Sequence, residues 1–570
     1  MVKNLIKNGT DLLFRRQTNI LSAATVIAVA VLASRILGLL KYRLLTANFT
    51  VSEIGVFIAS FRLPNTIFDL IVMGALTTAF IPVFTSFISR EKYHDADTIA
   101  STILNLSGVF FFFLSVLFLI FTEGLIGLMA PGLSSSELAL AVPFTRIMLL
   151  GQTLPLVLGN FLTGILQSHK RFLVPALAPV VYNLGIILGI VFLSPSMGLY
   201  GAVWGVVLGA VLFLLIQIPL SIHLKFHYRF LINLKHSGVV QIGKLIIPRT
   251  LGLAITQLNY VVNLAICSLL ATRAITIFNF AQQLAQLPIG IFAATISQAT
   301  LPTLSEEQDQ NDDFASFKKT LLTSLHQILF LTLPAAAILI ILRIPIVRLV
   351  YGAAKFDWFA TVETGRTLAF FGVGLVFESM VNLLVRGFYA LHDSKTPVVI
   401  GSISILLNII FSIVLIFFVP SLGRPVWALA LAGALADGLL AGTLLYRLNI
   451  RVGYFDLKKL LVPAAKMFSA ALLTGVSLYI PMKLLDQLVF DTTRTVPLLM
   501  LTGVATGIGL TVYFFLTWVF GISELSAFLG LGKKAWLFVV SSEHRVEQAV
   551  SEVVTKAAPE SLSESSHEGK

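Results

Sequence analysis

The sequence predicts an all-α polytopic membrane protein of about 14 transmembrane helices, and three observations support this fold class. Of the 570 residues, 57% are hydrophobic and only 12% are charged, whereas soluble domains average about 25% charged residues. Apolar runs of about 20 residues recur along the chain, each long enough to cross a hydrocarbon core of roughly 30 Å as a helix. Alternation of polar and apolar residues, which would indicate a membrane β-barrel, is weak.

The expected helices follow the apolar runs in chain order, with boundaries good to several residues. They cover residues 20–47, 54–88, 98–122, 138–167, 173–193, 199–222, 240–269, 274–302, 319–343, 362–389, 397–419, 426–448, 460–481 and 496–520. Because their number is even, the two termini are expected on the same side of the membrane.

Basic residues gather in alternate loops between these runs. The basic loops are 89–94, 167–171, 223–236, 391–395 and 447–459. The intervening loops, such as 130–137, carry few or no cations. This bias predicts that the basic loops and both termini are cytoplasmic. It also accounts for the net charge of +12 without a nucleic-acid partner.

The sequence has no motif typical of catalysis or of a metal site. Cys267 is the one cysteine, so an internal disulfide is excluded. Walker, HExxH and GxSxG patterns are absent. The acidic residues within 305–319 suit a solvated loop better than the paired carboxylates of a membrane glycosyltransferase. We therefore expect no enzyme activity, no metal and no cofactor other than a coupling ion.

The spans divide naturally into two bundles and an additional pair of helices. We predict a cytoplasmic segment, a first lobe, a cytoplasmic loop, a second lobe, two further helices and a cytoplasmic tail. Their boundaries are 1–19, 20–222, 223–239, 240–449, 450–520 and 521–570. The doubled arrangement is typical of transporters. The tail is polar, with valines at helical spacing between 546 and 554, and either a surface helix or disorder suits it.

Several ionisable residues lie inside the first two predicted spans. Arg35 lies about 15 residues into the first span, roughly 22 Å along a helix axis, and Lys41 follows near its end. Gly38 belongs to a row of small residues that would let another helix approach closely. Because charge at this depth is costly, such side chains usually face a bundle interior or a wet cavity.

The second span contains Arg62, Pro64, Asn65 and Asp69 within eight residues. Pro64 frees a backbone carbonyl, and a helix break there is tolerated where it lines a cavity. Arg62 and Asp69 are seven residues apart and share a helix face. They either neutralise each other or pair with neighbouring helices as structural groups, or they form the wall of a wet cavity.

Two carboxylates lie in later spans, Glu378 and Asp437. A carboxylate in lipid requires a cation, a proton or a buried basic partner. Both residues are therefore candidates for binding a coupling ion, Na⁺ or H⁺.

Five sequence blocks in matching order resemble the MurJ/MviN family, the lipid II flippases of the multidrug/oligosaccharidyl-lipid/polysaccharide exporter superfamily. The blocks are "SRILGLLK" (34–41), "FRLPNTIFDLIVMGALTTAFIPVF" (61–84), "GILQSHKRFLVPALAPVVYN" (164–183), "NFAQQLAQLPIGIFAATISQATLPTLS" (279–305) and "RGFYALHDSKTPV" (386–398). The resemblance implies a MATE/MurJ-like fold with two lobes around a central basic cavity. It also implies alternating access, and a lipid-tail groove formed by the last two helices.

The resemblance assigns binding of the substrate diphosphate to Arg35, Lys41 and Arg62, with Asn65 shaping the cavity and Pro64 and Gly38 at a helix break or gate. It places Asn263 near a sodium-binding carboxylate of the family, with Asn408 and Asp437 as partners. The basic positions of the family are replaced by other residues at several points. These are Phe68, Asp69, Gln282 and Gln283, and Gly55 and Met73 stand where acidic residues are usual.

We therefore expect a flippase that moves lipid II, an undecaprenyl-diphosphate-linked muropeptide, to the outer leaflet for peptidoglycan synthesis and cell shape. An exporter of another polyprenyl-linked sugar or of an amphipathic substrate is the alternative favoured by the lost cations. A non-transporting scaffold that binds cell-wall synthesis proteins is a third hypothesis.

Overall fold

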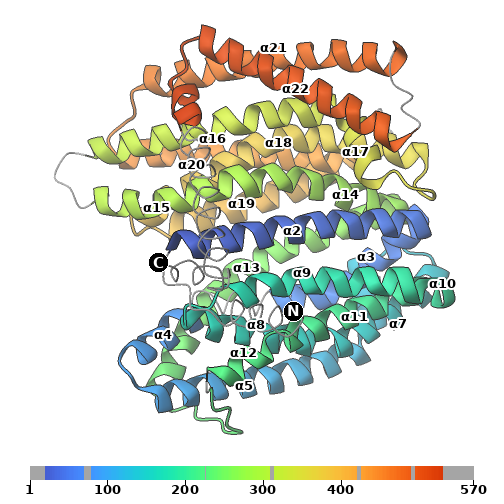
Figure 1. Cartoon of the computed structure of the whole chain (residues 1–570), viewed down its shortest axis with the longest axis vertical. Helices are drawn as coiled ribbons and strands as arrows, with labels where there is room; N and C mark the ends of the chain where they lie inside the picture. The colour runs from blue at the N-terminus through green and yellow to red at the C-terminus, as the bar shows by residue number, and fades with distance from the viewer. Residues whose placement is uncertain are drawn as a thin grey trace, which may run out of the picture.

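The computed structural model describes residues 20–69, 79–224, 226–308, 314–419, 425–488 and 494–530. The predicted tail beyond 530, the first segment 1–19, and Met73 lie outside these ranges. Within the described residues the protein is built from helices (Figure 1).

The first half of the chain contains eleven α-helices and one π-helical segment in the described residues. They are α2 (Ile20–Asn48), α3 (Val51–Phe68), α4 (Ile81–Ser89), α5 (Tyr93–Ile120), α6 (Thr122–Met129), α7 (Ser135–Gly151), α8 (Thr153–Ser168), α9 (Leu173–Leu188), η3 (Gly189–Leu193), α10 (Ser194–Met197), α11 (Leu199–Leu215) and α12 (Ile218–His223).

The second half continues with longer helices. They are α13 (Ser237–Leu270), α14 (Thr272–Pro288), η4 (Ile289–Ala293), α15 (Ala294–Gln308), α16 (Ala315–Ile341), α17 (Arg343–Tyr351), α18 (Trp358–Ala390), α19 (Lys395–Ile413), η5 (Val414–Phe418), α20 (Trp427–Arg451), α21 (Leu457–Leu488) and α22 (Thr495–Val519).

The predicted spans are confirmed as helices. Within the described residues, 11 helices are long and apolar enough to cross a membrane, and each coincides with one of the expected runs. The other three expected runs, 20–47, 54–88 and 240–269, fall on α2, on α3 with α4, and on α13.

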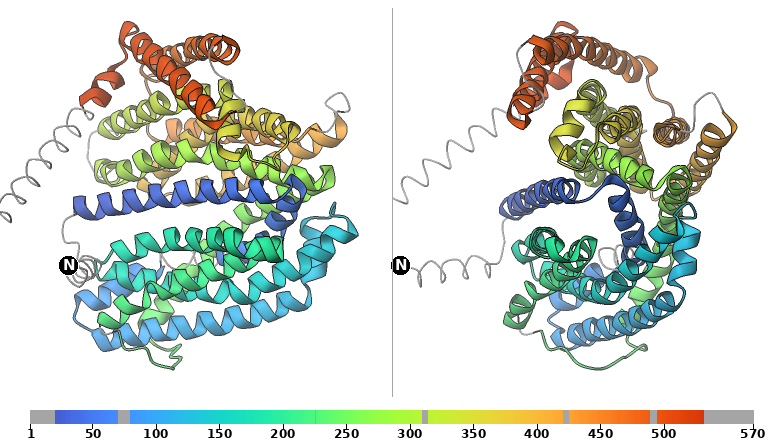
Figure 2. Two further views of the ribbon diagram at one scale, coloured as in Figure 1. Left: turned by 45° about the vertical axis from the view of Figure 1, so that its right-hand side comes forward. Right: turned by 90° about the vertical axis from the view of Figure 1, so that its right-hand side faces the viewer.

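The helices form two bundles with α2 and α13 between them. In Figure 1, α14 to α22 lie above α2, whereas α5 and α7 to α12 lie below it. Figure 2 shows the same division from two further sides, with α21 and α22 at the edge of the upper bundle. Helix α2 packs on α9 and also meets α17, and α13 packs on α14 and α19 but also meets α6. Both helices therefore contact both bundles.

Glycine permits the closest helix packing in the first bundle. A Cβ atom added to Gly189 would lie 2.2 Å from Gly205 Cα, and one added to Gly185 would lie 2.3 Å from Gly209 Cα. These contacts join α9 and η3 to α11 at backbone distance, the arrangement that small residues permit in membrane helices.

The antiparallel helices place all the basic loops at one end of the molecule, which we call the basic end. The opposite end carries α17 and is called the α17 end. Non-covalent contacts between segments distant in the sequence support this assignment. Arg451 pairs with Asp393 at the basic end, at 3.6 Å, and the backbone N–H of Lys355 donates to the Thr46 carbonyl at the α17 end.

Candidate substrate cavity

A cavity of about 290 Å³ lies between the two bundles. Its wall is formed mainly by α2, α3, α13 and α14, with single residues from α9 and α11. The polar residues among its lining are Lys41, Tyr42, Arg62, Asn65, Asp69, Tyr260, Asn263, Asn279, Gln282, Gln283 and Gln286. An internal polar chamber of this kind is where ionisable groups in a membrane protein are expected.

Arg62 is held by α13 rather than by Asp69. Its Nη2 donates to Gln257 Oε1, and its guanidinium lies 4.5 Å from the Tyr260 ring centroid. Gln257 Nε2 in turn donates to Asp69 Oδ2 at 3.3 Å. Among the described residues Arg62 and Asp69 form no ion pair. The direct pairing considered from the sequence is therefore absent, and the Gln257 amide bridges the two side chains instead.

This arrangement leaves hydrogen-bonding capacity on Arg62. Its Nε is buried and has no partner. A buried N–H without an acceptor costs about 1–3 kcal/mol, so an anionic group entering the cavity would gain from contact with this edge.

Pro64 does not interrupt α3, which continues to Phe68. The missing N–H of Pro64 frees the Ser60 carbonyl, and Thr145 Oγ1 on α7 donates to that oxygen at 3.0 Å. Asn65 accepts from Gln152 Nε2 at 3.4 Å, also across to the end of α7. The proline thus ties α3 to α7 instead of breaking the helix.

The three predicted positions on α2 differ in their surroundings. Lys41 lines the cavity, with its Nζ 4.4 Å from the Tyr42 ring centroid. Arg35 is exposed and is not among the cavity-lining residues; its Nη2 would lie 3.4 Å from a Cβ at Gly290 of η4. A Cβ at Gly38 would meet no atom within 4 Å. The close helix approach predicted at Gly38 is therefore absent in this structure.

The candidate coupling-ion residues form two groups. Asn263 Nδ2 and Asn408 Nδ2 both donate to Asn259 Oδ1, at 3.4 and 3.1 Å. Because these amides satisfy one another and the family's carboxylate is missing at Asn263, the group lacks negative charge. Asp437 forms no hydrogen bond with it.

The second group is the carboxylate pair Glu378 and Asp437. A Cβ at Gly374 would lie 3.3 Å from Ala434, and one at Gly438 would lie 3.5 Å from the Phe377 ring. These contacts put Glu378 and Asp437 at the same level of α18 and α20. Gln286 of the cavity donates to Glu378 at 2.9 Å. In the described part of the chain, neither carboxylate has an ion-pair partner.

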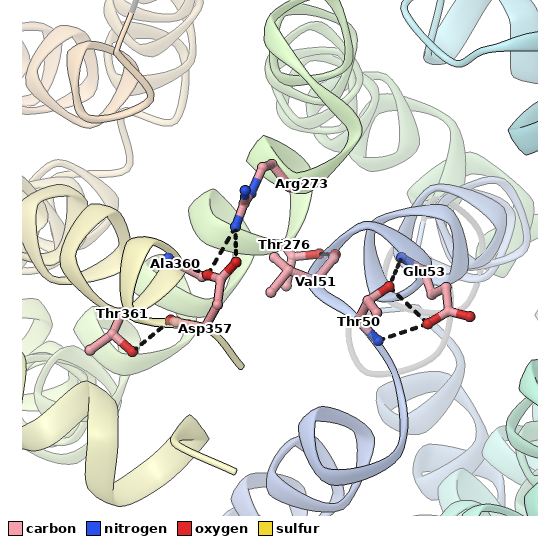
Figure 3. Close-up of polar contacts among 8 residues, drawn as sticks. All are labelled: Thr50, Val51, Glu53, Arg273, Thr276, Asp357, Ala360 and Thr361. Atoms are coloured by element: carbon pink, nitrogen blue, oxygen red, sulfur yellow. Dashed lines mark hydrogen bonds and ion pairs between the residues drawn. The ribbon is translucent and has the colours of Figure 1, made fainter. Parts of the chain in front are cut away.

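The α17 end of the cavity is closed by contacts between the bundles. Thr276 Oγ1 on α14 donates to the Val51 carbonyl on α3 at 2.7 Å, and Thr50 and Glu53 cap the same turn of α3 (Figure 3). A Cβ at Gly55 would lie 2.3 Å from the Thr272 carbonyl oxygen. A side chain at position 55 would therefore force α3 and α14 apart at this contact.

Helix α18 is fastened at the same end. Arg273 Nη2 donates to both carboxylate oxygens of Asp357, at 2.9 and 2.7 Å, and Asp357 accepts the N–H of Ala360 to cap α18 (Figure 3).

A separate apolar groove of about 510 Å³ runs along the outside of the upper bundle. It is lined by α16, α18 and α21, including Leu333, Val373, Phe468 and Gly475. The groove predicted for 460–520 therefore lies between α21 and the bundle, and α22 contributes no lining residue.

Sequence reasoning missed three polar lining residues, Tyr260, Asn279 and Gln286. Tyr260 is three residues after Gln257, so a helical repeat could have placed both beside Arg62. The other two lie in α14, where Gln282 and Gln283 already marked a polar face.

The fold and the chamber define a membrane transporter with two helical lobes. A family model described as "Lipid II flippase MurJ" matches residues 43–497. The chain belongs to this family and is a multi-pass inner-membrane protein.

Relatives and solved structures agree with this assignment. The "Lipid II flippase MurJ" of Burkholderia cenocepacia is 29% identical over 435 residues, covering 74% of this chain and 83% of the relative. The "Probable lipid II flippase MurJ" of Bdellovibrio bacteriovorus is 28% identical over 526 residues, covering 89% and 96%. A lipid II flippase MurJ in an inward closed conformation has a TM-score of 0.71 at 24% identity, covering 86% of this chain and 99% of that one. An inward-facing MATE transporter has a TM-score of 0.63 at 16% identity, covering 74% and 94%.

Proposed function

We propose that this protein flips lipid II from the cytoplasmic to the outer leaflet by alternating access, with its basic end and both termini in the cytoplasm. The observation that carries the proposal is the polar chamber between the lobes, where Lys41 and Arg62 line one cavity and Arg62 keeps an unpaired N–H. Arginine N–H groups and phosphate oxygens form short, charge-assisted hydrogen bonds.

Closure of the α17 end supports the direction of loading. With Thr276 bonded to Val51 and Gly55 packed on Thr272, entry from that end is blocked. A diphosphate would enter from the basic end, where alternate loops carry cations, and would leave after α3 and α14 separate.

Lipid II flipping in proteoliposomes tests this function directly. Purified protein should increase the fraction of labelled lipid II that becomes accessible to an external probe. Removing the Arg62 charge should weaken diphosphate binding about tenfold or more, since a hydrogen bond to a charged group contributes about 1.5–3 kcal/mol. If wild-type vesicles flip no lipid II under any gradient, this assignment fails.

The lost cations favour one alternative cargo. Asp69 lines the chamber where the family carries a basic residue, and Gln282 and Gln283 line it where the family has an Asp-Arg pair, so the wall has fewer cations. A lipid-linked sugar with a less charged headgroup suits such a wall better. Flipping of another polyprenyl-linked sugar in the same vesicles, without flipping of lipid II, would identify that cargo.

For the driving ion, we propose the carboxylate pair Glu378 and Asp437. Two carboxylates at the same level without a basic partner require a proton or a cation to neutralise them. Gln286 connects Glu378 to the substrate chamber, so ion binding and cargo binding share one wall.

A further inference from the structure

At the α17 end, the apolar groove continues into a second, basic pocket. This pocket has a volume of about 200 Å³ and is lined by α17, α21, α22 and Trp358. Ile341 and Tyr479 line both the groove and the pocket, so the two adjoin each other. A hydrocarbon chain in the groove would therefore place its headgroup in the pocket.

The pocket carries more positive than negative charge. Arg343 and Arg348 line it, and the Lys483 Nζ lies 5.9 Å from the ring centroid of Tyr479 in the same wall. The opposing charge in the lining is Asp486, which forms no ion pair with these cations among the described residues.

Both arginines keep free donors. The contacts found for the side chain of Arg343 include one hydrogen bond, from Nη1 to the Ile340 carbonyl at 2.7 Å. The Arg348 guanidinium lies 5.7 Å from the Trp358 ring centroid. Each guanidinium has five N–H donors, so most of this capacity has no hydrogen-bond partner among the described residues.

Neighbouring residues of α2 face the central cavity and α17. Tyr42 lines the cavity, whereas Arg43 points the other way and donates through Nη1 to the Leu349 carbonyl at 2.6 Å. Arg43 Nη2 also reaches Thr495 Oγ1 at 3.4 Å, at the start of α22.

We propose that the pocket and groove together bind a polyprenyl diphosphate, with the chain in the groove and the diphosphate on Arg343 and Arg348. This site receives the cargo lipid at the α17 end, and the inference rests on the proposed function. A diphosphate matches the excess of cations better than the single phosphodiester of a phospholipid. One groove leads to the pocket, which suits a single-chain lipid rather than a two-chain one.

The test measures binding of undecaprenyl diphosphate to the full-length protein in detergent, in an Arg62→Gln background that weakens the central cavity. R343Q and R348Q should each weaken binding about tenfold, because each removes a charge-assisted contact. Gly475→Leu should weaken it as well, since a Cβ there meets only Ile341, at 3.8 Å, and a longer side chain would fill the groove. Lys355→Gln, an exposed cation at the same end but outside the pocket, is the matched control.

Unchanged affinity in the R343Q/R348Q double variant, with an unchanged thermal midpoint, would overturn the inference. If phosphatidylglycerol competed equally well with undecaprenyl diphosphate, the site would be one for membrane phospholipid. If inorganic diphosphate competed equally well, the groove would contribute nothing to binding. Either result would also overturn the inference. Lipid II flipping by the wild type is measured in parallel, so that failure of the proposed function is seen separately from failure of this site.

Discussion

Thr276 on α14 donates its hydroxyl hydrogen to the main-chain carbonyl of Val51 on α3 over 2.7 Å, joining the two lobes at the α17 end. Four residues further along α3, Gly55 lies against the Thr272 carbonyl so closely that no side chain fits between them. This seam determines which side of the chamber is closed, and it is the part of the molecule that has to open in transport.

Substituting Gly55→Leu should open this seam. Overpacking of a tight contact costs about 1–3 kcal/mol, which shifts the population towards the open form roughly 5- to 150-fold. Cys267 reports this directly, because it is the only cysteine, is 1% exposed and lines the chamber. An impermeant thiol reagent applied from the α17 side should label the variant faster. Gly503→Leu, where a Cβ meets nothing within 4 Å, should label at the wild-type rate.

Replacing Asp69 by Asn should strengthen binding of an anionic headgroup. Asp69 lies one amide away from Arg62 through Gln257, so its charge offsets that of the guanidinium. At an effective dielectric constant near 20, removing the Asp69 charge should make the binding free energy of an anionic headgroup more favourable by about 1–2 kcal/mol. Undecaprenyl diphosphate affinity should rise about five- to thirtyfold. A fall in affinity would mean that Asp69 serves mainly to position Arg62.

Glu378→Gln and Asp437→Asn should uncouple transport from its ion gradient. Each substitution removes a charge that a cation or proton would neutralise. Flipping with an imposed Na⁺ or H⁺ gradient should fall to the rate without a gradient, while binding of the cargo changes little. Asp456→Asn, an exposed carboxylate at the basic end, serves as the control. If flipping still depended on the ion gradient in both variants, the coupling ion would bind at other residues.

The loop before α19 should make stability depend on acid pH. The Asp393 pKa lies below its ordinary value, mainly because the Thr396 backbone N–H donates to the carboxylate, with further help from the Thr396 hydroxyl and Arg451. A lowered pKa contributes stability that is present above the ordinary value of about 3.9 and is lost as pH falls through the folded value.

Asp393→Ala should therefore destabilise the protein by about 1 kcal/mol at pH 7, the usual contribution of a hydrogen bond, because it removes the acceptor of the Thr396 N–H and hydroxyl. The difference from wild type should shrink below about pH 4, where the unfolded carboxyl is already protonated. Thermal unfolding in detergent between neutral and acid pH measures both effects. A difference that stays constant across this range would exclude the charge as the cause.

Much of the fold could be predicted because membrane helices are encoded locally. Apolar runs longer than the hydrocarbon thickness predicted every span, and all fourteen expected ranges fall on helices in the described residues. The boundary errors are small, for example 362–389 predicted against Trp358–Ala390 observed, because a polar cap such as Asp357 extends beyond the apolar run.

The candidate site was predicted in composition but not in arrangement. Arg62 and Asn65 were recognised because they lie inside a predicted span, and Lys41 was added by the resemblance to the family. The partner of Arg62 is Gln257, 195 residues away. Helix periodicity shows which residues share a face of one helix, but it does not show which faces of two distant helices pack together. For the same reason the sequence could not show that Arg35, predicted with Lys41 to bind the diphosphate, is not among the residues that line the cavity.

The sequence by itself determined that this chain crosses the membrane many times, which loops are basic and which charges are buried at depth. These properties depend on the energy of moving each residue from water to lipid, which is nearly independent of its neighbours. Only the tertiary structure decided that Asp69 is bridged to Arg62 by an amide, that Gly55 seals the α17 end, and that an apolar groove adjoins a pocket lined by two arginines. Those features depend on contacts between helices far apart in the chain, where lipid offers no hydrophobic driving force and close packing selects the partner.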